Sequence, residues 1–384
     1  MNWFKQTLAN AVGTQEPEYG PEAIRTVTAQ AEKTPYTELT KDDLKWKAMQ
    51  STNVETQTFY AMSEEGKIVS LQMIYNNVAG MMTTCQLNVK LFDHKETGDP
   101  AVDHLWLSDP LENHGFDDDM KSFYADGVSI ALNEAGDEIA FKSARNELGL
   151  INLVFKRVTP GFQVGENGTT YYGTDPENPW GEMRHRFWPR CTITGNVITP
   201  EKTYDFKGHG CFIHAIQGMK PHHAAAKWDF VTFQTPTYSA IMMEFTTPAS
   251  YASTKVTVGG IAKDGEIISA GAHCTVKHPE TKEDPETFWP EPITAEYQWE
   301  GKSKEGDFSA ILKGPLGDRM DRIDILSHIP GVIKSLVGGV VGTRPYVYQF
   351  YNTPRDSLVL SIKNGDNPTV EEQGTFLSET SFVC

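Results

Sequence analysis

The sequence lacks the local signatures of the common nucleotide-binding and hydrolytic folds. It has no P-loop, no glycine-rich dinucleotide fingerprint, no GxSxG nucleophile elbow and no HExxH helix. Strands do not alternate with helices, which excludes the usual nucleotide-binding α/β folds. No stretch approaches the ~20 apolar residues of a membrane-spanning helix. The signal for an enzyme is therefore weak.

Positive charge is also scarce. Lys and Arg number 34 against 51 Asp and Glu, which gives a formal charge of -17 at pH 7. This balance argues against a nucleic-acid partner and against a basic surface that attracts anionic lipid.

Paired cysteines are missing as well, since the five cysteines are widely spaced and form no CxxC motif. Such usage is typical of reduced thiols in the cytosol. The first 13 residues have neither the apolar core of a secretory signal nor the arginines of a transit peptide. We therefore expect a cytoplasmic protein. The five cysteines are Cys85, Cys191, Cys211, Cys274 and Cys384.

Two-residue alternation of apolar and polar side chains is abundant from about residue 52 onward. In TCQLNVKLF, Cys85, Leu87, Val89 and Leu91 share one face, while Lys90 falls on the other. This pattern predicts a strand with one face in a core.

Hairpin turns recur along the chain, for example at Asp264-Gly265 and Asn364-Gly365. Short strands joined in this way predict an all-β protein built of antiparallel barrels or sandwiches. The length favours two such units in tandem. We divide the chain into a linker over 14–50 that packs on the body, a first unit over 51–217 and a second over 218–384.

The N-terminal residues 1–13 predict a short amphipathic helix that ends at Gly13. Its apolar stripe holds Trp3, Phe4, Leu8 and Val12. Aromatic residues prefer the headgroup boundary of a bilayer, so we expect this helix to contact membranes reversibly. Docking on the protein's own barrel is the alternative.

A second helical pattern covers residues 329–337. Ile329, Val332, Ile333 and Leu336 form its apolar stripe. The helix either packs across a barrel, or acts as a lid over an apolar cavity or as a second membrane contact.

Polar side chains are densest between residues 184 and 230, where five histidines accompany three arginines. Three roles are open for these side chains: they satisfy buried carbonyls between two units, orient a ligand, or bind a metal. Of these we expect no metal site, and we expect no cofactor. On a strand, His222 and His223 would point to opposite faces. The ligand-binding candidates are Arg184, His185, His222, His223 and Trp228, and the five histidines are His185, His209, His214, His222 and His223.

Several long motifs resemble the fungal survival factor 1 family, in order along nearly the whole chain. They include NVETQTFY, FYADGVSIALNE, PWGEMRHRFWPR, QGMKPHHAAAKWDF, MEFTTPASYASTKV and GTRPYVYQFY. The resemblance implies two lipocalin-like barrels in tandem, ceramide binding, and non-vesicular ceramide transport between the endoplasmic reticulum and the Golgi. It also implies an N-terminal membrane helix and a role in survival of oxidative and cold stress.

We therefore expect a soluble, monomeric ceramide carrier without catalytic activity. It would be cytoplasmic and attach reversibly to endoplasmic reticulum and Golgi membranes, and the nucleus stays open as a second compartment. Its barrels would enclose a ceramide-sized apolar cavity. One alternative is a lipocalin-fold hydratase or cyclase with an acid–base pair drawn from Asp103, His104, His222 and His223. A stress-related adaptor that exposes a protein-binding surface is the other.

Overall fold

The computed structural model describes residues 16–78, 80–93, 103–328, 345–352 and 358–383. The helices predicted over 1–13 and 329–337 lie outside these ranges. Among the described residues, no helix has both the length and the apolar character that crossing a membrane requires.

The largest sheet, here sheet A, takes its strands from residues 24–217, and all its pairings are antiparallel. Its main path runs β6 (Asp103–Leu111), β5 (Met82–Asp93), β4 (Lys67–Val78), β3 (Asn53–Ser63), β15 (Thr203–Gln217), β14 (Gly181–Ile198), β11 (Leu150–Arg157), β10 (Glu138–Ser143), β9 (Val128–Leu132), β8 (Phe123–Ala125) and β7 (Gly115–Phe116). Two short strands, β12 (Phe162–Val164) and β13 (Thr169–Tyr172), pair with β14 beside this path.

The remaining strands come from residues 227–382 and form sheets B and C, with one separate hairpin of β21 (Thr281–Glu283) and β22 (Pro290–Pro292). Sheet B runs β19 (Glu266–Gly271), β18 (Lys255–Lys263), β17 (Tyr238–Thr246), β16 (Lys227–Gln234), β29 (Thr375–Phe382), β26 (Tyr346–Asn352) and β25 (Arg319–Asp324). Sheet C runs β20 (Cys274–Lys277), β23 (Thr294–Ser303), β24 (Gly306–Pro315), β27 (Val359–Asn364) and β28 (Val370–Gln373).

Residues 16–50 carry short elements rather than an extended chain. These are η1 (Pro21–Ala23), β1 (Ile24–Arg25), α2 (Val27–Ala31), β2 (Tyr36–Glu38) and η2 (Lys41–Leu44). Strand β1 pairs with β13 and β2 pairs with β12, so this segment, predicted as a linker that packs on the body, extends sheet A. Three further short helices follow later, namely α3 (Pro221–Ala224), η3 (Ala249–Tyr251) and η4 (Ile325–His328).

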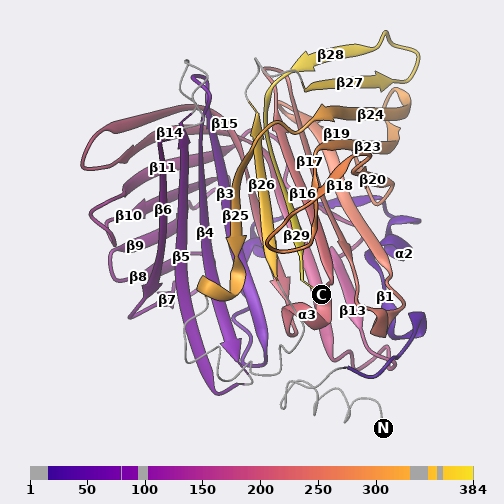
Figure 1. Ribbon diagram of the computed structural model, residues 1–384, viewed down its shortest axis with the longest axis horizontal. Helices are drawn as coiled ribbons and strands as arrows, with labels where there is room; N and C mark the ends of the chain where they lie inside the picture. The colour runs from indigo at the N-terminus through magenta and orange to yellow at the C-terminus, as the bar shows by residue number, and fades with distance from the viewer. Residues whose placement is uncertain (1–15, 79, 94–102, 329–344, 353–357, 384) are drawn as a thin grey trace.

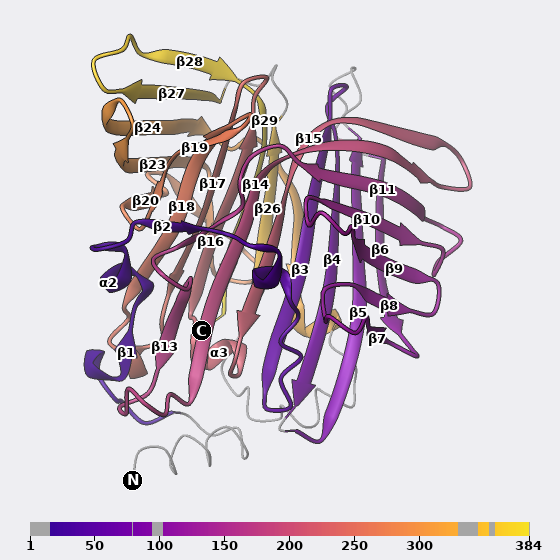
Figure 2. The same ribbon diagram turned by 180° about the vertical axis from the view of Figure 1, so that it is seen from behind.

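The curled sheets enclose three apolar cores. Sheet A curls so that β3–β6 run across β7–β11, and sheets B and C face each other in the same way (Figures 1 and 2). One core lies inside sheet A and a second between sheets B and C. The third fills the junction, where the outer face of sheet A meets that of sheet B. The predicted all-β class with curled antiparallel sheets is confirmed.

Local strand predictions also hold. Cys85, Leu87, Val89 and Leu91 are buried on the inner face of β5. The turns at Asp264-Gly265 and Asn364-Gly365 join β18 to β19 and β27 to β28.

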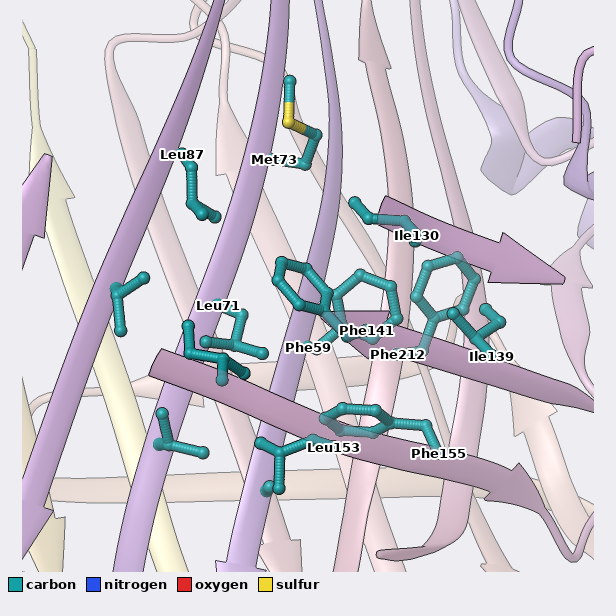
Figure 3. Close-up of a cluster of buried hydrophobic side chains, with 14 of the residues drawn as sticks. Phe59, Leu71, Met73, Leu87, Ile130, Ile139, Phe141, Leu153, Phe155 and Phe212 are labelled. Carbon is teal, nitrogen blue, oxygen red and sulfur yellow. The ribbon is translucent and has the colours of Figure 1, made fainter. Parts of the chain in front are cut away.

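The interior of sheet A is filled by side chains, which corrects the expectation of a preformed ceramide-sized cavity. The ring of Phe59 lies 4.8 Å from that of Phe212, 5.0 Å from Phe155 and 5.3 Å from Phe141. Figure 3 shows these rings together, with aliphatic side chains around them. Two depressions, of about 460 Å³ beside β9–β11 and about 260 Å³ beside β20, lie outside this aromatic cluster.

Candidate functional site

The inner face of sheet A changes from apolar to polar toward one end of β3, β14 and β15. On β3, Phe59 belongs to the interior core, and two-residue alternation places Gln57 and Glu55 on the same face. On β15, His214 follows the interior Phe212 in the same way and pairs with Gln57 across the strands. Arg186 and Arg184 continue the inner face of β14 beyond Trp188.

Glu55 is the anionic centre of this polar end. Its side chain is 0% exposed and accepts hydrogen bonds from the backbone N–H groups of Lys47 and Ala48, both at 2.8 Å, and from His214 Nε2 at 2.7 Å. Burial raises the pKa of Glu55, but the hydrogen bond and charge of His214 and the two backbone donors outweigh it. The pKa therefore lies below its ordinary value, and the group is a carboxylate.

His214 is held as a neutral imidazole with a defined tautomer. It is 0% exposed, and burial lowers its pKa despite the hydrogen bond to Glu55. Because Nε2–H donates to the carboxylate, Nδ1 carries a lone pair and acts as an acceptor. Nδ1 is buried and has no hydrogen-bond partner in the described ranges.

The two arginines of this face differ in how well they are paired. Arg186 makes a 2.9 Å ion pair with Asp43 and donates to Gln163 Oε1 at 2.8 Å, and burial lowers its pKa to about 10. Burial also lowers the pKa of Arg184, with Glu55 and Glu182 acting against it. Arg184 Nε and Nη2 are buried without a hydrogen-bond partner in the described part of the chain.

Residues 43–48 cover the polar end. The backbone N–H of Trp46 donates to the Met120 carbonyl at 2.7 Å, and its ring lies 5.4 Å from that of His214. Trp46 and Gln57 are each 2% exposed, yet Trp46 Nε1 and Gln57 Oε1 have no partner among the residues that the structure describes.

Unpaired buried polar atoms are uncommon in folded proteins, and each one costs about 1–3 kcal/mol. The polar end gathers three donor atoms and two acceptor atoms in this state beside an apolar core. This set is suited to an uncharged ligand group that both accepts and donates hydrogen bonds. Within the described ranges, no three His, Cys, Asp or Glu side chains gather as a metal site requires. The five atoms are Trp46 Nε1, Arg184 Nε, Arg184 Nη2, Gln57 Oε1 and His214 Nδ1.

The predicted ligand candidates do not form one group. Arg184 faces the interior of sheet A, whereas its neighbour His185 faces the junction. The His185 ring lies 6.1 Å from Trp228 and 6.3 Å from Phe245, and burial lowers its pKa to about 4. His185 and Trp228 therefore belong to the apolar packing between the sheets.

His222 and His223 lie on α3, so the expectation that they alternate along a strand is wrong. Their rings are in contact, with centroids 4.3 Å apart, instead of pointing to opposite sides. Proline at the first position of α3 favours a helical turn here. His223 Nδ1 lies 3.5 Å from Glu16 Oε1, and burial lowers the pKa of His223 to about 3 and that of His222 to about 4.

Three sets of predicted residues lie outside what the structure describes. The membrane-contact residues are Trp3, Phe4, Leu8 and Val12, and the lid residues are Ile329, Val332, Ile333 and Leu336. The backbone of Asp103 and His104 begins β6, but their side chains are outside the described set.

Sequence reasoning missed Trp46, Glu55 and Gln57. Glu55 and Gln57 alternate with Phe59 along one face of β3, which was a usable signal. Polar residues at such positions are usually placed toward solvent, because most carboxylates and amides of globular proteins are exposed.

Comparison with known proteins identifies the relatives of the chain. The model of the Svf1 family matches residues 1–384. Ceramide-binding protein svf1 of Emericella nidulans is 54% identical over 385 residues and covers 100% of both chains. The protein of the same name from Aspergillus fumigatus is 53% identical over 400 residues, again with 100% of both chains covered. That of Schizosaccharomyces pombe is 39% identical over 386 residues, with 99% of each chain covered.

Solved structures share the fold at low identity. Kievitone hydratase from Nectria haematococca has a TM-score of 0.50 at 12% identity and covers 96% of this chain and 98% of its own. CghA with Sch210972 has a TM-score of 0.50 at 12% identity and covers 86% of this chain and 88% of its own. These likenesses extend to the fold alone.

Proposed function

The chain belongs to the Svf1 family, and on that premise we propose that it binds ceramide and carries it between membranes without covalent chemistry. The observation that carries this proposal is the 54% identity to a ceramide-binding protein over the full length of both chains. The unpaired polar atoms at the end of the sheet A interior support it, because a lipid amide and hydroxyls need both donors and acceptors.

The architecture belongs to the same proposal. Each unit is a lipocalin-like barrel, and residues 1–13 form the helix that contacts membranes of the endoplasmic reticulum and Golgi from the cytoplasm. Full burial of Trp3, Phe4, Leu8 and Val12 would stabilise the bound state by roughly 6–12 kcal/mol, at about 1.5–3 kcal/mol for each side chain. Partial insertion and ordering of the helix reduce this value, so attachment is reversible, as a carrier requires.

The filled interior adds a condition to the proposal. Pockets for small-molecule ligands measure about 300–1,000 Å³. In the centre of sheet A, aromatic rings occupy the space that such a pocket would need. Ceramide binding therefore selects a more open arrangement of these side chains, whose population the lipid increases. The segment over 329–337, proposed as a lid, is one route to such opening.

Extraction of co-purified lipid tests the function directly. The full chain is purified from a ceramide-producing host, and the bound lipid is identified by mass spectrometry. We expect ceramide, enriched over its share of the host membranes. Recovery of diverse lipids in membrane proportion would contradict the proposal.

Lipid extraction after incubation with ceramide distinguishes a carrier from the hydratase or cyclase alternative. Ceramide incubated with excess protein should be recovered unchanged, whereas a new product mass would indicate an enzyme. Retention of ceramide by His222→Ala and His223→Ala would remove these two candidates from the ligand site.

A further inference from the structure

We propose that Trp46, Gln57, Arg184 and His214 form the headgroup subsite of the lipid, inside sheet A and not at the junction of the two units. This assignment rests on the proposed function for its ligand. It identifies the ligand class as a lipid with a secondary amide and free hydroxyl groups.

The hydrogen-bonding groups of the subsite complement those of a ceramide headgroup. Trp46 Nε1 and Arg184 Nη2 have N–H groups to donate, and the amide carbonyl has two lone pairs to accept them. Gln57 Oε1 is an acceptor for the amide N–H. His214 Nδ1 is an acceptor for a hydroxyl proton, because Glu55 holds the proton of the ring at Nε2. Four groups that have no hydrogen-bond partner among the described residues would each gain one.

The position of the subsite also suits a lipid. Phe59 follows Gln57 on the inner face of β3, and Phe212 precedes His214 on that of β15, so the aromatic core begins one inward position away. Acyl chains attached to a headgroup at the polar end would extend along these rings. Arg184 and Arg186 oppose Glu55 and Asp43, and Glu182 pairs with Lys47, so these charges balance and fit an uncharged lipid.

The alternative explanation is that these residues only stabilise the fold. A substitution at Gln57 distinguishes this structural role from a ligand-binding role. Gln57→Leu keeps a similar volume and removes an acceptor that has no partner in the described ranges. A ligand role predicts equal or higher melting temperature without lipid, together with weaker ceramide binding. A structural role predicts a lower melting temperature.

Ceramide and diacylglycerol presented in phosphatidylcholine vesicles provide the second readout. The ester of diacylglycerol lacks the amide N–H but keeps a carbonyl. Gln57→Leu should therefore weaken ceramide binding by roughly 3- to 10-fold and leave diacylglycerol binding unchanged. Trp46→Phe should weaken both lipids by similar factors, since it removes a donor to the carbonyl. Thr58→Val is the matched control, because Thr58 neighbours Gln57 but its side chain lies on the outer face of β3.

The outcomes distinguish the two levels of the proposal. Failure of the unchanged protein to bind ceramide would overturn the proposed function and the subsite together. Ceramide binding by the unchanged protein that Gln57→Leu and Trp46→Phe leave intact would overturn the subsite alone. Loss of ceramide preference in Gln57→Leu, with Thr58→Val unaffected, is the result that the subsite predicts.

Discussion

Acid should destabilise the junction between the two units through His185. His185 is buried beside Phe187, Trp228 and Phe245, and burial lowers its pKa from 6.5 to about 4. In the unfolded chain the imidazole binds a proton near pH 6.5, while in the folded protein it stays neutral down to about pH 4. The unfolded state binds more protons between these values, so stability decreases as the pH falls.

The lowered pKa of His185 sets the size of this loss in the free energy of unfolding. A change from 6.5 to about 4 corresponds to a loss of about 3 kcal/mol, since one pKa unit is about 1.4 kcal/mol. Glu55 and Asp229 add to this loss at the acid end of the window, because their pKa values are lowered from the ordinary 4.5 and 3.8 in the folded protein and the unfolded chain therefore binds protons first. The lowered pKa values of His222 and His223 also reduce the stability of the protein in this window. A variant at His185 alone is therefore needed to isolate its contribution.

His185→Phe removes the titrating group from this position. Urea unfolding of the full chain, measured at several pH values between about 7 and 4, gives the free energy of unfolding for both proteins. The variant should lose about 3 kcal/mol less than the unchanged protein over this range. Parallel pH profiles would contradict this expectation, because they would mean that the imidazole of His185 has the same pKa in the folded and unfolded states.

Three further predictions concern the helix, the junction and the interior. Deletion of residues 1–13 should leave the melting temperature nearly unchanged and abolish liposome flotation, and Leu8→Asp should have the same effect; a melting temperature many degrees lower would place the helix in the core. Arg190→Met should reduce the free energy of unfolding by about 3–5 kcal/mol, because the fully buried Arg190 donates to the carbonyls of Thr235, Pro236 and Tyr238 across the junction. A loss below about 1 kcal/mol in urea unfolding would contradict this. Phe59→Ala should cost about 3–5 kcal/mol by leaving a cavity in the sheet A interior, and an unchanged urea midpoint would show that the rings do not pack as described.

Alternation in the sequence predicted which face of a strand is apolar, but not what covers the other face. β5 illustrates both outcomes, since its apolar residues are buried as expected. Lys90, on the opposite face, is also buried, because sheet B covers the outside of sheet A at this position. Its ammonium contacts Asp321 of β25 and donates to Gln349 of β26 at 2.6 Å. No local pattern in the sequence reports a partner more than 200 residues away.

The candidate site was predictable only in part for the same reason. Arg184 and His214 were noticed as members of a dense polar stretch. Trp46, Glu55 and Gln57 come from a different part of the chain. The pairing of β3 with β15 brings Glu55 and Gln57 beside His214, and Trp46 reaches His214 from the segment 43–48 that covers the polar end. Conversely, His222 and His223 lie on the short helix α3 and not on a strand, so their side chains do not alternate as expected. Residue type and spacing thus identified candidate groups, while tertiary pairing decided which of them meet.

Ceramide transfer between two vesicle populations shows whether the protein is a ceramide carrier. Donor vesicles carry ceramide in phosphatidylcholine, acceptor vesicles carry phosphatidylcholine alone, and the lipid composition of separated acceptors is followed over time. Catalytic amounts of the full chain should accelerate ceramide transfer and leave the phosphatidylcholine composition unchanged. Transfer no faster than the spontaneous rate, with protein bound to both vesicle populations, would contradict this expectation.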